Sequence, residues 1–205
     1  MGNHKNLMTH QAVFLDRDGT VNEEVGYVNH IDRVCLLPRA AQAIRLLNEH
    51  GFRTVVMTNQ SGVARGYFSE ALVNEIHQRI QDSLREEGAT LDGIYYCPHH
   101  PDFGNPPYRQ KCRCRKPETG MVEEAVKRFQ IDCSRSYMVG DRGLDIEFAH
   151  KIGAKGILVL TGYGKGEWEH FGKGWKEQPD HVAQDLYDAV QWILFQESSL
   201  RSSTR

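Results

Sequence analysis

Three short apolar runs of the chain each lead directly into polar side chains. Asp16 and Asp18 follow the first run, Thr58 and Asn59 follow the second, and Asp141 follows the third. Carboxylates that lie close together repel one another unless a cation separates them, and Mg²⁺ prefers such oxygen ligands. A carboxylate can also attack phosphorus and form an aspartyl-phosphate. These residue types therefore predict Mg²⁺-dependent phosphoryl transfer, although any one Asp alone could be a helix cap or a turn residue.

A second group of residues has the types and spacing of a structural zinc site. Cys97, Cys112 and Cys114 provide three thiols, and His99 or His100 provides an imidazole, all within residues 97–114. Three thiolates and one imidazole match tetrahedral Zn²⁺ coordination. We expect this zinc to hold the loop 97–117 together rather than to react, and to place the basic residues that follow it over the phosphoryl-transfer site.

The elements that must position these residues alternate along the chain. Apolar runs predict strands, and apolar residues at helical spacing predict helices between them. This alternation predicts an α/β fold with a doubly wound parallel sheet, in which ligands bind outside the carboxyl ends of the strands. The expected strands are 12–15, 54–57, 94–96, 137–139 and 157–160, and the expected helices are 40–47, 69–88, 122–129, 144–152 and 185–196.

Length and composition restrict the class of protein. The 205 residues suffice for one well-buried core, so we expect a single domain over 11–197, without a large cap domain, between flexible tails 1–10 and 198–205. The formal net charge of -2 argues against a general nucleic-acid coat or a polybasic membrane protein. No apolar run is long enough to span a bilayer. Five cysteines without a secretory signal favour the reducing cytoplasm, and we expect a monomer there.

The polar residues also carry a family resemblance. The segment Asp16-Arg17-Asp18-Gly19-Thr20 resembles the DxDGT signature of the haloacid dehalogenase-like phosphohydrolases, and Thr58, Lys116 and Asp141 resemble that superfamily's later motifs. The resemblance implies that Asp16 is the nucleophile and Asp18 the general acid and base. It further implies that Thr58 and Lys116 stabilise the transferring phosphoryl group, and that Mg²⁺ is held by Asp16, the Asp18 carbonyl and Asp141. Asp145 is interpreted either as a supporting group or as an acid that faces a helix dipole.

Three further segments resemble one branch of the superfamily, which holds heptose-bisphosphate and histidinol-phosphate phosphatases. They read TNQSG, YYCPHHP and CRCRKP. This resemblance selects His99 as the fourth zinc ligand and implies a small phosphorylated sugar as substrate. The expected reaction is removal of the 7-phosphate of a heptose bisphosphate, and a histidinol-phosphate or other small phosphomonoester phosphatase is the alternative. The implied substrate pocket consists of Glu24, Val25, Gly26, Tyr27, Thr58, Asn59, Gln60, Ser61, Arg115, Lys116 and Arg142.

A third hypothesis is a zinc-stapled nucleic-acid-binding module. The basic residues Arg109, Lys111, Arg113, Arg115 and Lys116 surround the cysteines and motivate it. The net charge argues against it, as does the lack of interleaved aromatic residues beyond Tyr108.

Two features have no role in the resemblance. The Gly- and Trp-rich segment Gly162–Pro179 has no assignable motif and is interpreted as an irregular surface loop, or as a flap near the crevice. His77 lies among polar positions of its predicted helix and is interpreted as solvated.

Overall fold

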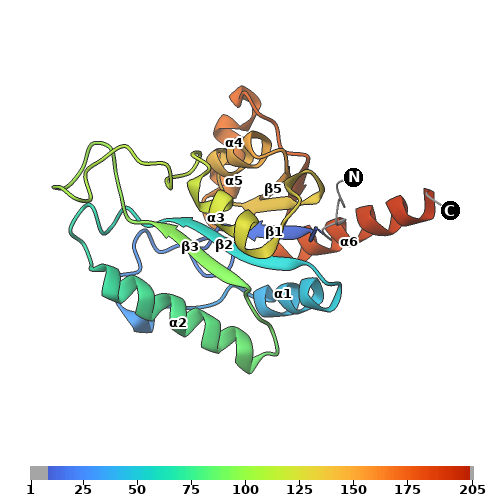
Figure 1. Ribbon diagram of the computed structural model, residues 1–205, viewed down its shortest axis with the longest axis horizontal. Coiled ribbons are helices and arrows are strands. Elements are labelled where there is room, and N and C mark those ends of the chain that lie inside the picture. Colours follow the sequence, from blue (N-terminus) through green and yellow to red (C-terminus); the bar gives the residue numbers. More distant parts are fainter. Residues whose placement is uncertain (1–8, 204–205) are drawn as a thin grey trace, which may run out of the picture.

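A parallel sheet of six strands runs through the structure, a computed structural model that describes residues 9–203 (Figure 1). The strand order is β3-β2-β1-β4-β5-β6, the order of doubly wound dinucleotide-type folds. All five predicted strands are confirmed. The sixth was not predicted, because three residues are too short for a readable pattern. The strands are β1 (Ala12–Leu15), β2 (Arg53–Asn59), β3 (Gly93–Cys97), β4 (Tyr137–Gly140), β5 (Lys155–Val159) and β6 (His181–Ala183).

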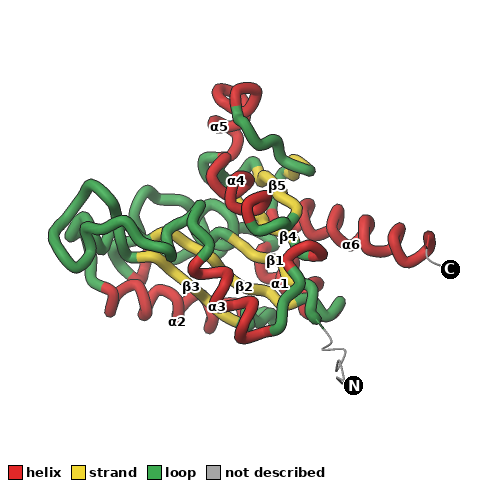
Figure 2. The backbone as a smooth tube through the Cα atoms, turned by 45° about the horizontal axis from the view of Figure 1, so that its top comes forward, coloured by secondary structure: helices red, strands yellow, loops and turns green. Residues whose placement is uncertain are grey.

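Helices cover both faces of the sheet, as alternation along the strands requires (Figures 1 and 2). In β1, Val13 and Leu15 pack on one core, while Ala12 and Phe14 pack on the other. The first core includes α1 (Ala40–Glu49), α2 (Glu70–Glu86) and α6 (Leu186–Ser203), and the second includes α3 (Gly120–Phe129) and α4 (Gly143–Lys151). The predicted α/β fold with a doubly wound sheet is therefore confirmed, and the described residues form no additional large cap domain.

The strand order reverses between β1 and β4. From β1 the chain builds outward to β2 and β3, and then returns to the other side of β1 with β4. The loops that follow β1 and β4 diverge at this point, which leaves a crevice at the carboxyl end of the sheet. The three polar segments singled out in the sequence follow β1, β2 and β4, so all three lie at this edge.

The segment 162–179 differs from the irregular loop that we expected. It contains helix α5 (Gly164–Phe171) and a 3-10 turn (Gly172–Gly174). Tertiary contacts explain this order, since the Trp168 and Trp175 rings pack with centroids 5.9 Å apart. The Glu167 carboxylate accepts a hydrogen bond of 2.9 Å from the Gly143 amide, which ties α5 to the start of α4.

The two ends of the domain differ from the expected boundaries at residues 11 and 197. Helix α6 continues to Ser203, so the boundary expected at residue 197 falls inside a helix, which extends away from the sheet in Figures 1 and 2. Most of the expected tail 1–10 lies outside the described residues, and His10 donates a backbone hydrogen bond to Gln130. Across residues 9–203, no helix has the length and apolar content needed to cross a membrane.

His150 ties α4 to the segment that precedes β6. Its Nδ1 lies 2.9 Å from Glu177 and its Nε2 lies 3.1 Å from Asp180. Partial burial opposes protonation of the ring, but these two carboxylates raise the His150 pKa above its ordinary value. The protonated ring therefore stabilises the fold, and this contribution is complete below about pH 6.5, the ordinary His pKa.

We expect this stabilisation to fade as the pH rises through the raised pKa of His150. The measurement is the urea midpoint of the wild type minus that of His150→Gln, taken from about pH 5.5 to pH 9. The difference should be largest at the acidic end and should shrink toward pH 9. A difference that stays constant, or that grows with pH, would contradict the ion pairs.

Candidate active site

A cavity of about 310 Å³ opens at the carboxyl ends of β1, β2 and β4. Most of the residues predicted for catalysis and substrate binding line it, whereas Val25 and Asp141 are not among the lining residues. Arg65, Leu144 and Tyr163 also line the cavity, and none of them was predicted. The predicted residues in the lining are Asp16, Asp18, Glu24, Gly26, Tyr27, Thr58, Asn59, Gln60, Ser61, Arg115, Lys116 and Arg142.

Three carboxylates meet at the base of this cavity. The side-chain oxygens of Asp16, Asp141 and Asp145 all lie within 4.8 Å of one another. Burial raises the pKa of Asp16 and of Asp141, and the repulsion between the neighbouring carboxylates adds to the effect. A divalent cation would relieve this crowding, so the donor set fits Mg²⁺. The Asp18 side chain lies outside this cluster. This position agrees with the family resemblance, which assigns the backbone carbonyl of Asp18, and not its carboxylate, to the metal.

The ammonium group of Lys116 lies among these carboxylates. This group is buried and donates to Asp16 at 2.7 Å and to Asp145 at 2.6 Å. Burial alone would lower the pKa of Lys116, but Asp145 and Asp16 raise it above its ordinary value, so the side chain stays charged. Asn59 fixes the backbone of Lys116 through two hydrogen bonds: its Oδ1 accepts from the Lys116 amide at 3.0 Å, and its Nδ2 donates to the Lys116 carbonyl at 3.1 Å. Asn59 thus positions the lysine in addition to lining the cavity.

The two interpretations of Asp145 both describe its position. One oxygen accepts the hydrogen bond from Lys116, and the other accepts a bond of 3.2 Å from the Arg142 amide at the start of α4. The second bond satisfies a backbone donor at the start of the helix, as the third-position acid of a capping box does. The carboxylate therefore holds Lys116 and caps the helix at the same time.

Asp18 is held by Arg17 and Asn22, which were not predicted as site residues, and by Gln60, which was predicted only to line the substrate pocket. The buried Arg17 guanidinium donates to both oxygens of Asp18, at 2.8 and 2.7 Å from Nη2. Asn22 and Gln60 donate to the same carboxylate, each at 2.9 Å. Burial alone would raise the pKa of Asp18, but Arg17 and these amide donors hold it below its ordinary value. The side chain is thus an ionised, well-oriented carboxylate in this structure.

His77 was wrongly expected to be solvated. It is buried on α2, and its Nε2 lies 3.2 Å from Nη1 of Arg17. Burial, together with the Arg17 charge, lowers the His77 pKa to about 3, so the ring is neutral and Nε2 accepts the hydrogen bond. Helical periodicity could have found this position, because His77 falls on the apolar face formed by Val73, Ile76 and Ile80.

The four predicted zinc ligands come together in the loop after β3. The Cys97 and Cys112 sulfurs lie 3.5 Å apart, Cys112 and Cys114 lie 3.4 Å apart, and His99 Nδ1 lies 3.3 Å from Cys114. Ligands of a tetrahedral Zn²⁺ at about 2.0–2.3 Å lie roughly 3.3–3.8 Å from one another, so the spacing fits. The other candidate, His100, instead accepts a hydrogen bond from the Asp102 amide.

Two arginines that the resemblance assigned to the substrate lie on the cavity wall. Arg115 donates a hydrogen bond of 3.2 Å to the backbone carbonyl of His99, which is one of the four predicted zinc ligands. The Arg142 guanidinium lies 4.1 Å from the centre of the Tyr163 ring and 3.9 Å from Glu167, both from the segment around α5. The unassigned segment 162–179 therefore orients one wall of the cavity.

The basic residues after His99 do not form one free surface. Lys116 is buried, Arg115 lines the cavity, and Arg113 pairs with Glu123 at 2.6 Å. This arrangement does not favour a nucleic-acid-binding face.

Comparison with known proteins identifies the class of this fold and site. A profile described as HAD-hydrolase-like matches residues 113–189. A solved D,D-heptose 1,7-bisphosphate phosphatase from B. bronchiseptica, complexed with magnesium and phosphate, superposes with a TM-score of 0.79 at 34% identity, over 91% of this chain and 99% of that chain. The protein is thus a hydrolase of the haloacid dehalogenase-like class.

Curated relatives define the family within this class. The D-glycero-D-manno-heptose-1,7-bisphosphate 7-phosphatase of Thermosynechococcus vestitus is 43% identical over 197 residues, which cover 91% of this chain and 96% of the relative. The D-glycero-beta-D-manno-heptose-1,7-bisphosphate 7-phosphatase of Haemophilus ducreyi is 48% identical over 191 residues, which cover 91% of this chain and 100% of the relative. The chain belongs to the family of D-glycero-D-manno-heptose-1,7-bisphosphate 7-phosphatases.

Proposed function

We propose that the protein hydrolyses the 7-phosphate of D-glycero-D-manno-heptose 1,7-bisphosphate and leaves the 1-phosphate for nucleotide activation. The observation that carries this proposal is the Asp16 carboxylate, which lies beside Lys116 at the base of a cavity whose walls bear further arginines. Such a cavity suits a small substrate with two phosphates. The names of the relatives supply the sugar. The product would enter nucleotide-heptose synthesis for lipopolysaccharide or surface glycans.

The geometry supports a two-step mechanism. An oxygen of Asp16 attacks the 7-phosphorus, and the bond from phosphorus to the sugar oxygen breaks as Asp18 protonates that oxygen. The negative phosphate next to Asp18 favours the protonated carboxyl that this step needs. Water then attacks the aspartyl-phosphate while Asp18 accepts its proton, which releases phosphate and regenerates Asp16.

The remaining groups act on the charge that develops at the phosphoryl oxygens. Lys116 and Thr58 would donate hydrogen bonds to those oxygens. Mg²⁺ would be held by the Asp16 and Asp141 carboxylates and the Asp18 carbonyl, where it would neutralise charge and orient the phosphate. Gln60 donates to the Thr58 hydroxyl at 2.9 Å and to Asp18, so it links the two catalytic groups.

The proposed substrate is tested by comparing kcat/KM for three compounds with Mg²⁺: both anomers of the heptose bisphosphate and histidinol phosphate. We expect one anomer of the bisphosphate to exceed histidinol phosphate by about 100-fold, since charge-assisted hydrogen bonds to a second phosphate contribute about 1.5–3 kcal/mol each. A preference for histidinol phosphate would move the protein to histidine synthesis and overturn the proposed substrate.

We further propose that Cys97, His99, Cys112 and Cys114 bind one structural Zn²⁺. Burial raises the pKa of the Cys97 thiol, so a thiolate there requires a neighbouring cation. Metal analysis of protein purified without chelator should find about one zinc per chain. Cys112→Ser should lower both the zinc content and the melting temperature, whereas the matched control Cys35→Ser, at an exposed cysteine, should change neither. Folded, active protein without zinc would refute this site.

We also propose a cytoplasmic monomer that binds no nucleic acid. All five cysteines are free in the structure, which suits a reducing compartment.

A further inference from the structure

Arg65 differs from the other cations of the cavity wall, because its side chain has no polar partner. Within residues 9–203, the Arg65 side chain makes no ion pair or hydrogen bond, and its Nε is a buried donor without an acceptor. By contrast, Lys116 has two carboxylates, Arg115 has a carbonyl, and Arg142 has Glu167. A buried donor without a partner costs free energy, so an anionic ligand in the cavity would complete the environment of Arg65.

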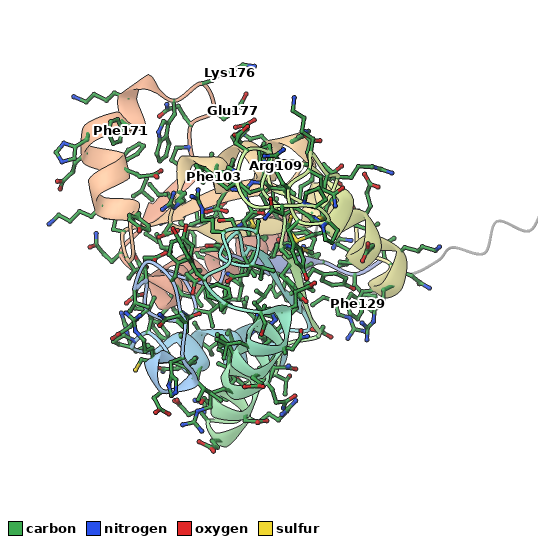
Figure 3. The ribbon with its side chains drawn as sticks, turned by 90° about the vertical axis from the view of Figure 1, so that its left-hand side faces the viewer. Phe103, Arg109, Phe129, Phe171, Lys176 and Glu177 are labelled. Carbon is green, nitrogen blue, oxygen red and sulfur yellow. The ribbon has the colours of Figure 1, made fainter. Side chains whose placement is uncertain are left out.

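An aromatic ring from the zinc loop holds the Arg65 guanidinium in place. The central carbon of this guanidinium lies 3.7 Å from the centre of the Phe103 ring, which is a cation–π contact. The His100 ring packs on the same Phe103 ring, with the two ring centres 4.6 Å apart. Figure 3 looks onto this side of the molecule and labels Phe103 and Arg109 on the loop. Stacking leaves the N–H groups at the edge of the guanidinium free to bind an anion.

The backbone of the zinc loop also touches the turn that carries Arg65. The Ala64 amide donates a hydrogen bond of 3.2 Å to the Pro98 carbonyl, between two of the clustered zinc-type ligands. Gly104 has a φ of +87°, and a Cβ at this position would collide with the carbonyl of Ala64. The loop tip and the turn after β2 therefore pack backbone to backbone, so the zinc loop determines where Arg65 lies.

We propose that Arg65 determines specificity by binding the phosphate that is not transferred, and that Phe103 is the residue that positions it. This inference rests on the proposed function. Lys116 and Thr58 lie at the base of the cavity with Asp16 and serve the reacting phosphate. The Arg65 guanidinium on the wall has neither a hydrogen bond nor an ion pair among the described residues, and a phosphate monoester dianion has the charge and the oxygens to supply both.

The test compares the heptose 1,7-bisphosphate with the heptose 7-phosphate, which lacks the second phosphate. For Arg65→Met we expect kcat/KM for the bisphosphate to fall about 30-fold, mainly through KM, and kcat/KM for the monophosphate to change less than about 3-fold. Phe103→Leu should give the same pattern with a loss of about 3- to 5-fold. Arg65→Lys keeps the charge without the planar fork, and its loss should fall between that of Arg65→Met and the wild type.

Arg109→Met is the matched control, because Arg109 is exposed on the same loop and does not line the cavity. It should hydrolyse both substrates at the wild-type rate. Zinc content and melting temperature should be unchanged in every variant.

Three other results would overturn the inference. Equal losses on both substrates would make Arg65 a structural residue, and no loss on the bisphosphate would remove it from the subsite; either overturns the inference while the proposed function stands. A wild type that does not prefer the bisphosphate to histidinol phosphate would overturn the proposed function, and the inference with it.

Discussion

Asp16→Asn is expected to reduce phosphate release by about 10⁴-fold or more while the protein stays folded. The amide is nearly the same size as the carboxylate but cannot attack phosphorus. Its oxygen still accepts a hydrogen bond from Lys116, which now pairs with one anion, Asp145, instead of two. The variant also removes one of three crowded carboxylates, so the free energy of unfolding should not fall steeply.

The measurement is phosphate release under saturating substrate, accompanied by acid quenching with labelled substrate. Wild-type protein should retain label as a phosphoryl-enzyme, and Asp16→Asn should retain none. Asp32→Asn is the matched control, since Asp32 is an exposed acid outside the cavity. Substantial activity in folded Asp16→Asn would assign the nucleophile to another residue.

Lys116→Met is expected to be the most destabilising change in the site and to lower kcat by about 10³-fold. The ammonium group is buried between Asp16 and Asp145, so its removal leaves two carboxylates without a counter-charge. Breaking a buried ion pair in this way costs about 3–5 kcal/mol. The loss should be largest at neutral and alkaline pH, and should shrink on acidification as the carboxylates take up protons, because burial already raises the pKa of Asp16.

Urea unfolding without added Mg²⁺ measures this effect, and a second variant separates charge from packing. Lys116→Met/Asp145→Asn removes one of the uncompensated charges, so it should recover part of the stability and none of the activity. If Lys116→Met were as stable to urea as the wild type at neutral pH, the lysine could not be buried between the two acids as described.

The sheet and its two layers were readable from the sequence because their signals are local. The short apolar run of β1 is buried throughout, and the Ser69 hydroxyl caps α2 by accepting from the Leu72 amide; both features are encoded by neighbouring residues. Helix α5 could not be read in this way, since Gly164 and Gly166 disfavour a helix. Its order comes from Glu167 bonding to Gly143, which lies in another segment, and from the packing of Trp168 on Trp175 within the segment.

The residues of the candidate site also differ in whether local sequence or distant contacts reveal their role. Asp16, Asp141 and the zinc-type ligands were predictable, because a strand end or a short loop brings them together. Arg17 and Arg65 were not singled out, because each acquires its role from a residue far along the chain. Arg17 meets His77 on α2, and Arg65 meets Phe103 on the zinc loop. No local pattern marks such a pair.

The most direct measurement of the central claim is phosphorus-31 NMR of the heptose 1,7-bisphosphate incubated with wild-type protein and Mg²⁺. We expect the 7-phosphate resonance to disappear as inorganic phosphate appears, while the 1-phosphate resonance persists with unchanged intensity. Loss of the 1-phosphate, or persistence of both resonances with folded, zinc-loaded protein, would contradict it.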